Sequence, residues 1–449
     1  VNAGDRAVAA ISALAAMHFT LVALLAILAR ASAQGNSTAF PPGWNHLAKS
    51  PPMGWRSWNA FGANINDKTF RDAIDAVTAK VWDVGGAKAS LFEVGYTRVG
   101  IDEGWENCSG TDPDHGLRQH NVDGTPMINV DKFPDLKGLV DYGHSKGVLM
   151  GWYLNGCACG EREERKVNYE GDVKLLDAFG FDAVKLDGCG AATNMTLYAS
   201  LMQATGKAYE TENCHWGHCG ADSWYKNPDG SSCPTQTWAP FNHYRTSGDI
   251  NSGLTSWFAN LQTTTKFQNL THPLSQPGVW AYPDMLEVGR IDGGSFAWNR
   301  AHFGAWCVVS APLILGLDIT DTENLASIVP IITNAEAIAV NQHWAGHPGR
   351  LVKEFPPSGA AGHMDGDQVQ VWAKPQPDGA LAVFVVNPSP SGKATAVSVD
   401  FATLGLPPSV TAAKLRDIWA QQDVGTTAGA TLTASVEPLD SAFFLLTPA

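Results

Sequence analysis

Residues 181–189 read FDAVKLDGC, a short apolar run that ends in an aspartate and a glycine. Successive side chains of a strand point to opposite faces, so Lys185 and Asp187 are expected on the same face. A strand buried on both sides is typical of a parallel sheet, in which polar residues gather where the strand ends. The stretch therefore predicts a βα unit that presents Asp187 at its carboxyl end.

Seven more segments along the chain repeat this pattern, and helix-like stretches separate them. The expected strands are 53–58, 96–102, 148–154, 183–187, 208–212, 244–249, 279–284 and 312–317. The expected helices include 69–81, 136–146 and 172–179, and Gly147 and Gly180 are placed to end two of them. Alternation of eight such units predicts an α/β fold, the (β/α)8 TIM barrel, in which chemistry takes place at the carboxyl ends of the strands.

The pattern of residue types changes after residue 341. Segments 369–372, 382–386 and 442–446 are rich in strand-forming apolar residues and are separated by Pro and Gly. This pattern predicts a small C-terminal antiparallel β-sandwich over residues 350–449, following a barrel over residues 45–345. The expected hinge between them is Gly-His-Pro-Gly at 346–349.

Composition narrows the class of partner. The chain has 449 residues, enough for two domains, and a formal net charge of -14. Proteins bind nucleic acids and anionic lipid surfaces through clustered Lys and Arg residues. The acidic charge balance of this chain does not indicate such a cluster. The high content of Trp and Gly suits the aromatic walls and tight turns of a carbohydrate site.

The N-terminal region contains an apolar run at residues 17–28, followed by the small residues Ala31-Ser32-Ala33 that a signal peptidase requires. Arg30 interrupts the run before it reaches the roughly 20 apolar residues of a membrane-spanning helix. We therefore interpret residues 1–33 as a signal peptide with its upstream segment, and expect no membrane span in the mature chain. The expected location is extracellular, or a lysosome- or vacuole-like compartment reached through the secretory pathway.

Glycosylation triplets and the number of cysteines also fit passage through the secretory pathway. Asn-X-Ser/Thr triplets predict glycosylation, and eight Cys suit disulfides of an oxidising compartment. Cys307 lies in an apolar run and is expected to be a buried free thiol. Residues 214–219, CHWGHC, could hold a metal, but no second cluster matches them; we interpret them as a disulfide-tied loop and expect no metal. The triplets begin at Asn36, Asn107, Asn194 and Asn269.

Polar and aromatic side chains concentrate at the predicted strand ends, which a purely structural role does not require. Hydrolysis of a glycosidic bond with retention needs a nucleophilic carboxylate and an acid about 5 Å apart. Asp187 is a candidate nucleophile, with Lys185 placed to keep it ionised. An Asp that caps the following helix explains the spacing alone equally well. The strand-end residues are Trp58, Asp102, Glu103, Asn155, Asp187, Asn213, Asp249 and Asp284.

Six motifs resemble, in the same order, those of family 27 of the glycoside hydrolases, the α-galactosidase and α-N-acetylgalactosaminidase family. The resemblance covers roughly residues 51–351, and it implies a TIM barrel with a C-terminal sandwich. Each motif alone is modestly specific, whereas six in one order are strongly so. They are residues 52–58 (PMGWRSW), 95–105 (GYTRVGIDEGW), 144–147 (HSKG), 185–189 (KLDGC), 245–250 (RTSGDI) and 283–286 (PDML).

The resemblance implies roles for individual residues. Asp187 would be the nucleophile and Asp249 the acid/base, with Arg245 near the reacting centre. Trp58 would form an apolar wall for the sugar, and Asp102 would bind the hydroxyls at C4 and C6. For the apolar and aromatic members of the set, core packing is the alternative. The other implied pocket residues are Glu103, Tyr153, Lys185, His215, Asp284 and Met285.

Five residues, in three parts of the chain, depart from the family pattern. His215 stands where α-galactosidases carry a Glu near the sugar 2-hydroxyl, and His218 takes a nearby apolar position. An imidazole can still form a hydrogen bond, but its charge depends on pH; a solvent-facing His215 is the alternative. Glu103 stands where Asp is usual, so its reach is longer. Ala281 and Tyr282 replace an Asn-Asp pair.

The leading hypothesis is a retaining exo-α-galactosidase that needs no cofactor, because two carboxylates complete the chemistry. The nearest alternative is the same mechanism on a β-L-arabinopyranoside or an α-N-acetylgalactosaminide. A catalytically silent lectin or structural glycoprotein belongs to a different class, and the presence of both Asp187 and Asp249 argues against it. The sequence leaves the oligomeric state open, and a homodimer is compatible with it.

Overall fold

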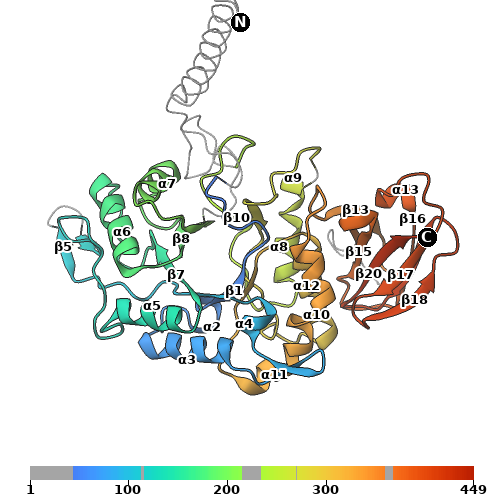
Figure 1. Cartoon of the computed structure of the whole chain (residues 1–449), viewed down its shortest axis with the longest axis horizontal. Helices are drawn as coiled ribbons and strands as arrows, with labels where there is room; N and C mark the ends of the chain where they lie inside the picture. Colours follow the sequence, from blue (N-terminus) through green and yellow to red (C-terminus); the bar gives the residue numbers. More distant parts are fainter. Residues whose placement is uncertain (1–43, 113–115, 215–233, 269, 359–367) are drawn as a thin grey trace, which may run out of the picture. The chain divides into compact units, whose positions relative to one another are not determined.

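A computed structural model describes residues 44–112, 116–214, 234–268, 270–358 and 368–449. An eight-stranded parallel sheet runs in the order β11-β10-β9-β8-β7-β4-β1-β12 (Figure 1). A parallel bridge between Leu286 and Leu315 joins the segment after β11 to β12, so the edges of the sheet meet. The expected TIM barrel is confirmed, and each predicted strand overlaps one of those observed. They are β1 (Met53–Arg56), β4 (Arg98–Gly100), β7 (Leu149–Leu154), β8 (Ala183–Asp187), β9 (Glu210–Cys214), β10 (His243–Arg245), β11 (Trp280–Tyr282) and β12 (Leu313–Leu315).

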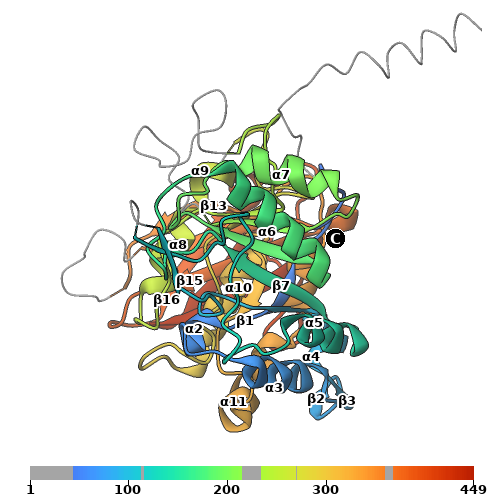
Figure 2. The same ribbon diagram turned by 90° about the vertical axis from the view of Figure 1, so that its left-hand side faces the viewer.

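Helices pack outside this sheet, as the view onto α5, α6 and α7 shows (Figure 2). Their amphipathic sequences explain the packing: α3 is capped by Asn66 and buries Phe70, Ile74 and Val77. Gly180 ends α6 with a left-handed φ of 84°, as its position predicts. The helices are α2 (Trp58–Phe61), α3 (Asp67–Thr78), α4 (Leu91–Val94), α5 (Leu136–Ser145), α6 (Lys166–Phe179), α7 (Met195–Ala204), α8 (Ser256–Gln262), α9 (Thr265–Gln268), α10 (Phe296–Val308), α11 (Thr322–Ile332) and α12 (Ala335–Gln342).

Two small antiparallel hairpins decorate the loops of this part of the chain. β2 (Trp82–Val84) pairs with β3 (Ala87–Ala89), and β5 (Gly110–Asp112) pairs with β6 (Gly116–Arg118). None of the helices in the described ranges is long and apolar enough to cross a membrane. The segment interpreted as a signal peptide, residues 1–33, lies outside those ranges.

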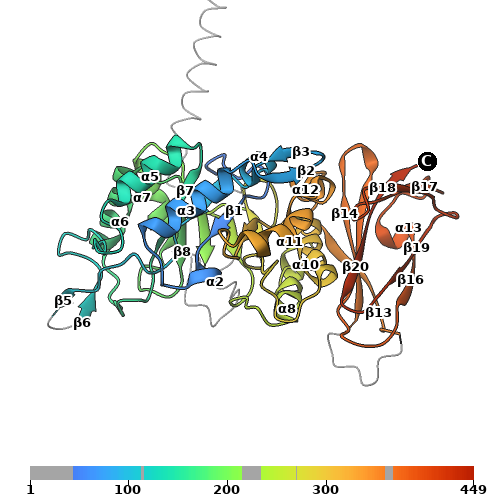
Figure 3. The same cartoon turned by 90° about the horizontal axis from the view of Figure 1, so that it is seen from below.

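The C-terminal part consists of antiparallel strands, as its segments of strand-forming residues predict (Figure 3). Alternate side chains of the larger sheet meet those of the smaller sheet in an apolar core that includes Val371, Val385 and Val399. Helix α10 packs against β20, where Arg300 pairs with Asp440 at 2.9 Å. The larger sheet has the order β13 (Arg350–Phe355), β14 (Val369–Pro375), β15 (Leu381–Asn387), β20 (Asp440–Pro448), β17 (Ala413–Asp417) and β18 (Gln422–Thr426), with the short helix η1 (Pro377–Gly379) between β14 and β15 in the chain. The smaller sheet pairs β16 (Thr395–Asp400) with β19 (Thr431–Val436), and the short helix α13 (Phe401–Leu404) follows β16.

Candidate active site

A cavity of about 260 Å³ opens where the barrel strands end at their carboxyl side. Its lining brings together residues from seven strands or the loops that follow them. Of the site residues expected from the sequence, only His215 is missing from the lining, because it lies outside the described residues. The expected residues that line the cavity are Trp58, Asp102, Glu103, Tyr153, Lys185, Asp187, Arg245, Asp249, Asp284 and Met285.

Asp187 ends β8 and is held by two neighbouring side chains. Its Oδ2 accepts a hydrogen bond from the Tyr153 hydroxyl at 2.7 Å, and its main-chain oxygen accepts one from the Asn155 side chain. Burial and the nearby carboxylate raise the pKa of Tyr153 well above its ordinary value, so the hydroxyl remains a donor. Oδ1 of Asp187 is buried and has no hydrogen-bond partner among the described residues. Oδ2 is therefore anchored by Tyr153, whereas no donor among the described residues occupies Oδ1.

Asp249 lies in the loop beyond β10, four residues after the strand ends at Arg245, and its side chain is 57% exposed. Arg245 contacts Asp249 Oδ1 at 3.1 Å and Asp284 Oδ2 at 2.7 Å. Burial disfavours the charged guanidinium, but Asp284 and the other anions around it raise the pKa of Arg245 above its ordinary value. The guanidinium therefore stays charged and bridges an exposed carboxylate and a buried one.

Asp284 adopts a backbone conformation that is rare outside glycine, with a φ of 87°. The N–H groups of Ile250 and Met285 donate to its two carboxylate oxygens, at 2.9 and 2.7 Å. Burial raises its pKa despite these donors and the charge of Arg245. Strained residues of this kind cluster at functional sites.

Asp102 and Lys185 form a buried ion pair on the floor of the cavity. Lys185 Nζ lies 2.9 Å from Asp102 Oδ2 and 5.0 Å from the centre of the Tyr153 ring. Burial alone would lower the pKa of Lys185, but Asp102 raises it above its ordinary value. The sequence predicts Lys185 beside Asp187, whereas its direct ion-pair partner is Asp102.

Glu103 uses its longer side chain to reach a neighbouring loop. Its Oε1 accepts the N–H groups of Cys157 and Ala158, at 2.9 and 2.8 Å. Burial raises its pKa even though these donors favour the charged form. A disulfide joins Cys157 to Cys189, which follows β8, so Glu103 helps to fix the loop beside Asp187.

The apolar members of the predicted set occupy different environments. Trp58 begins α2 and leaves 36% of its surface exposed, which suits a wall that a ligand can cover. Met285 is buried and packs with Tyr282 and Ile314, so core packing and cavity lining are combined in one side chain. Tyr282 is fully buried and is not part of the lining.

The cysteines follow the predictions in part. Disulfides join Cys108 to Cys159 and Cys157 to Cys189, and Cys307 is a buried free thiol, as expected. The expectation of a disulfide at Cys214 is wrong, because this residue is also a buried free thiol. As the last residue of β9, it lines the cavity, and its Sγ accepts a hydrogen bond from Arg245 Nη1 at 3.5 Å. Within the described ranges, no group of three or more His, Cys, Asp or Glu could hold a metal ion.

Five lining residues were not expected from the sequence. Asn59 directly follows Trp58 and Ile250 directly follows Asp249, so their place next to predicted residues is the signal that could have identified them. The three cysteines were interpreted through their redox chemistry rather than through their place at the strand ends. The five are Asn59, Cys157, Cys189, Cys214 and Ile250.

Comparisons with known proteins agree with this geometry. Residues 50–343 match the family model described as Alpha galactosidase A, and residues 366–446 match that of the Alpha galactosidase C-terminal beta sandwich domain. The chain is 31% identical over 446 residues to the alpha-galactosidase of Oryza sativa subsp. japonica, and the match covers 94% of each chain. It is 25% identical to the alpha-N-acetylgalactosaminidase of Gallus gallus, over 90% of this chain and 95% of that relative.

Solved structures share the fold at lower identity. The α-galactosidase of Saccharomyces cerevisiae has a TM-score of 0.73 at 20% identity, and the match covers 91% of this chain and 100% of that chain. A β-L-arabinopyranosidase from Geobacillus stearothermophilus has a TM-score of 0.68 at 19% identity, covering 90% and 98%. One architecture therefore accommodates enzymes whose names give different sugars.

Proposed function

Because this chain belongs to the α-galactosidase family, we propose that it is a retaining exo-glycosidase that releases terminal α-linked galactose by double displacement. Asp187 is the nucleophile and Asp249 the acid/base. The observation that carries the proposal is the convergence of ten expected residues on one cavity at the strand ends. The match to α-galactosidases over 94% of both chains supports the choice of sugar.

The first step divides the work between the two carboxylates. The Asp187 carboxylate attacks the anomeric carbon, and Asp249 donates its proton to the glycosidic oxygen as the carbon–oxygen bond breaks. The leaving alcohol departs, and the sugar remains bound to Asp187 as an ester. The hydrogen bond from Tyr153 to Oδ2 orients the Asp187 carboxylate for this attack.

The second step uses the same two groups in reverse. Asp249 takes a proton from water, the resulting nucleophile attacks the anomeric carbon, and the ester bond to Asp187 breaks. The exposure of Asp249 suits this role, because the group must meet both the leaving alcohol and solvent water. The partly buried Asp187 suits a covalent intermediate that must be shielded until the leaving alcohol has gone.

Two substitutions test the assignment. Asp187→Asn should abolish turnover of every galactoside. Asp249→Asn should still form a glycosyl-enzyme from a dinitrophenyl galactoside, because a leaving group of low pKa needs little protonation. Intact-mass spectrometry detects the added hexosyl group. Asp292→Asn, which removes an exposed carboxylate outside the lining, is the matched control.

Two results would contradict the proposal. Equal tolerance of both substitutions, or labelling that persists in Asp187→Asn, would remove Asp187 from its role. If none of the nitrophenyl α-galactoside, α-N-acetylgalactosaminide and β-L-arabinopyranoside is cleaved from acidic to neutral pH, the lectin or structural alternative takes its place.

Recognition at C2 is assigned to His215, which lies outside the described residues. An imidazole that binds the 2-hydroxyl stabilises the transition state of a 2-hydroxy sugar more than that of its 2-deoxy analogue. His215→Ala should therefore weaken the 2-hydroxy substrate selectively, by about 1 kcal/mol or more in kcat/KM. An equal loss for both substrates would point to another residue, and His218→Ala is then the next variant to measure.

The enzyme is proposed to pass through the secretory pathway. Its two disulfides and its plant relatives support this location. Asn194 lies exposed at the start of α7, in one of the Asn-X-Thr triplets. Export from a eukaryotic host, with a loss of mass on N-glycan removal, is the expected result, whereas retention of unmodified protein in the cytoplasm would contradict it.

A further inference from the structure

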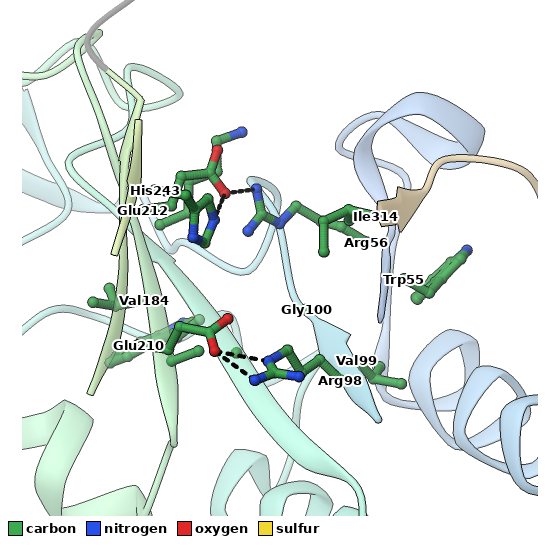
Figure 4. Close-up of a pocket in the computed structure, with 14 residues that line it drawn as sticks. Trp55, Arg56, Arg98, Val99, Gly100, Val184, Glu210, Glu212, His243 and Ile314 are labelled. Atoms are coloured by element: carbon green, nitrogen blue, oxygen red, sulfur yellow. Dashed lines mark hydrogen bonds and ion pairs between the residues drawn. The ribbon is translucent and has the colours of Figure 1, made fainter. Parts of the chain in front are cut away.

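The interior of the barrel contains charged side chains where such barrels are usually filled by branched apolar residues. A second cavity, of about 30 Å³, lies among strands β1, β4 and β7 to β10 (Figure 4). The dashed lines of the figure mark ion pairs across it, from Arg56 to Glu212 and from Arg98 to Glu210, and the hydrogen bond between His243 and Glu212. Neither Arg56 nor Glu212 has a role in the mechanism above.

The two arginine pairs lie at successive levels. Glu210 and Glu212 are two residues apart on β9, so they point the same way, and Glu212 is nearer the carboxyl end of the strand. Arg56 is in register with Gly100, two residues further along β4 than Arg98. The Arg56–Glu212 pair therefore lies at the level closer to the substrate cavity, and the Arg98–Glu210 pair lies deeper in the barrel.

Only the upper pair reaches a residue of the substrate cavity. Arg56 Nε lies 3.8 Å from Asp102 Oδ2, the same oxygen that pairs with Lys185 at 2.9 Å. Asp102 Oδ1, on the other side of the carboxylate group, accepts a hydrogen bond from the N–H of Glu103 at 2.9 Å. Two cations thus hold one oxygen of Asp102 and set the direction of the other.

The neighbouring strand is shaped to accept this guanidinium. A Cβ at Gly100 would lie 3.2 Å from Arg56 Nε, and its other near contacts would also be atoms of Arg56. The missing side chain at Gly100 therefore leaves the space that Arg56 occupies beneath Asp102. Glu212 and Arg56 are almost fully buried, with side chains 1% and 12% exposed, so the pair is screened little by solvent.

We propose that Arg56 is a positioning residue for sugar recognition: anchored by Glu212 from below, it holds the Asp102 carboxylate in the orientation that binds the substrate hydroxyls. The inference rests on the proposed function, in which Asp102 binds galactose at C4 and C6. It adds a specificity determinant that does not touch the sugar. Arg98 and Glu210 serve only to neutralise each other in the deeper level.

The test compares a galactoside with its 6-deoxy analogue, which lacks one hydroxyl assigned to Asp102. Arg56→Met should lower the ratio of kcat/KM between nitrophenyl α-D-galactoside and nitrophenyl α-D-fucoside by about tenfold, which corresponds to about 1.4 kcal/mol. Arg98→Met makes the same chemical change one level deeper. It should lower the melting temperature but leave the ratio within about twofold of the parent, since an ion pair that stabilises the fold affects both substrates alike.

Two further variants keep the test decisive if Arg56→Met does not fold. Arg56→Met combined with Glu212→Gln removes both charges, so that no buried carboxylate is left alone. Gly100→Ala keeps every charge but pushes on the guanidinium. Both should lower the ratio as Arg56→Met does. If they leave the ratio unchanged, as Arg98→Met is expected to do, the positioning role is refuted.

Asp102→Ala separates this inference from the proposed function. If Asp102→Ala lowers the ratio and the Arg56 variants do not, Asp102 binds the sugar without help from Arg56, and only the positioning role fails. If Asp102→Ala itself leaves the ratio unchanged, the assigned contact at C6 fails and the positioning role fails with it.

Discussion

His120 offers a test of charge burial away from the catalytic carboxylates. It lies between the β5–β6 hairpin and α6, with Nδ1 3.0 Å from Glu161 and Nε2 3.0 Å from Asp172. Burial would lower its pKa, but Asp172 and Glu161 outweigh burial and raise the pKa of His120 to about 9. A doubly protonated imidazole can donate to both carboxylates at once.

The raised pKa corresponds to a stability that depends on pH. The difference between about 9 in the folded protein and 6.5 in the unfolded chain corresponds to about 3 kcal/mol, at 1.36 kcal/mol per pKa unit. A raised folded pKa means that this contribution is fully present below pH 6.5 and is lost as the pH rises through 9. His120→Gln should therefore destabilise the protein by about 3 kcal/mol more at pH 6 than at pH 9.5.

Urea unfolding followed by tryptophan fluorescence measures this difference in wild type and variant at both pH values. His144→Gln is the matched control, because His144 pairs with Asp182 at 2.7 Å with 38% of its side chain exposed. Its effect should stay within about 1 kcal/mol at either pH. An unfolding difference for His120→Gln that is constant with pH would show that folding leaves the pKa of His120 unshifted, and one that grows toward pH 9.5 would show that the folded protein holds His120 neutral.

Three further predictions concern the cavity and its chemistry. EDTA should leave hydrolysis unchanged, because two carboxylates complete the reaction; activity lost with EDTA and restored by a divalent ion would contradict this. Gly104→Ala should cost about 2 kcal/mol or more in unfolding free energy, because φ is 119° and a Cβ would lie 2.6 Å from the Ala63 oxygen; an unchanged urea midpoint would contradict it. Glu103→Asp should lower kcat/KM about fivefold, or about 1 kcal/mol, because the shorter arm no longer reaches the N–H groups of Cys157 and Ala158; equal activity would show that this loop needs no such anchor.

The fold was predictable because its signal repeats. Eight apolar segments that end in polar residues specify parallel strands without any knowledge of their partners, and all eight are present. Boundaries were less predictable. Strand β9 spans Glu210–Cys214, two residues beyond its expected range of 208–212, and ion pairs keep Glu210 and Glu212 inside the barrel. Helix α6 begins at Lys166 rather than at residue 172, because its first turns bury polar residues such as Asn168 that do not follow an apolar period.

The site was predictable as a set of residues, but its contacts were not. Period 2 and the family motifs place the carboxylates at strand ends, and they meet in one cavity. The partner of Lys185 was missed because it comes from β4, whereas the sequence argument considered only the neighbour two residues away. The free thiol of Cys214 was missed as well, since residues 214–219 were interpreted as a disulfide-tied loop.

The ion pairs beneath the cavity show what information a strand's own sequence lacks. Register aligns Arg56 with Gly100, Gly100 with Gly151, and Gly151 with Ala183. Three neighbouring strands therefore present small residues at one level of the interior, next to the cavity that Arg56 and Arg98 line. Alternation within a strand predicts the face of each residue, but only register tells which residues share a level. An eight-stranded barrel must fill its interior with side chains. Once register is known, small residues on three adjacent strands leave a space that long side chains must fill, and here Arg56 of β1 and Arg98 of β4 fill it because β9 supplies a glutamate for each.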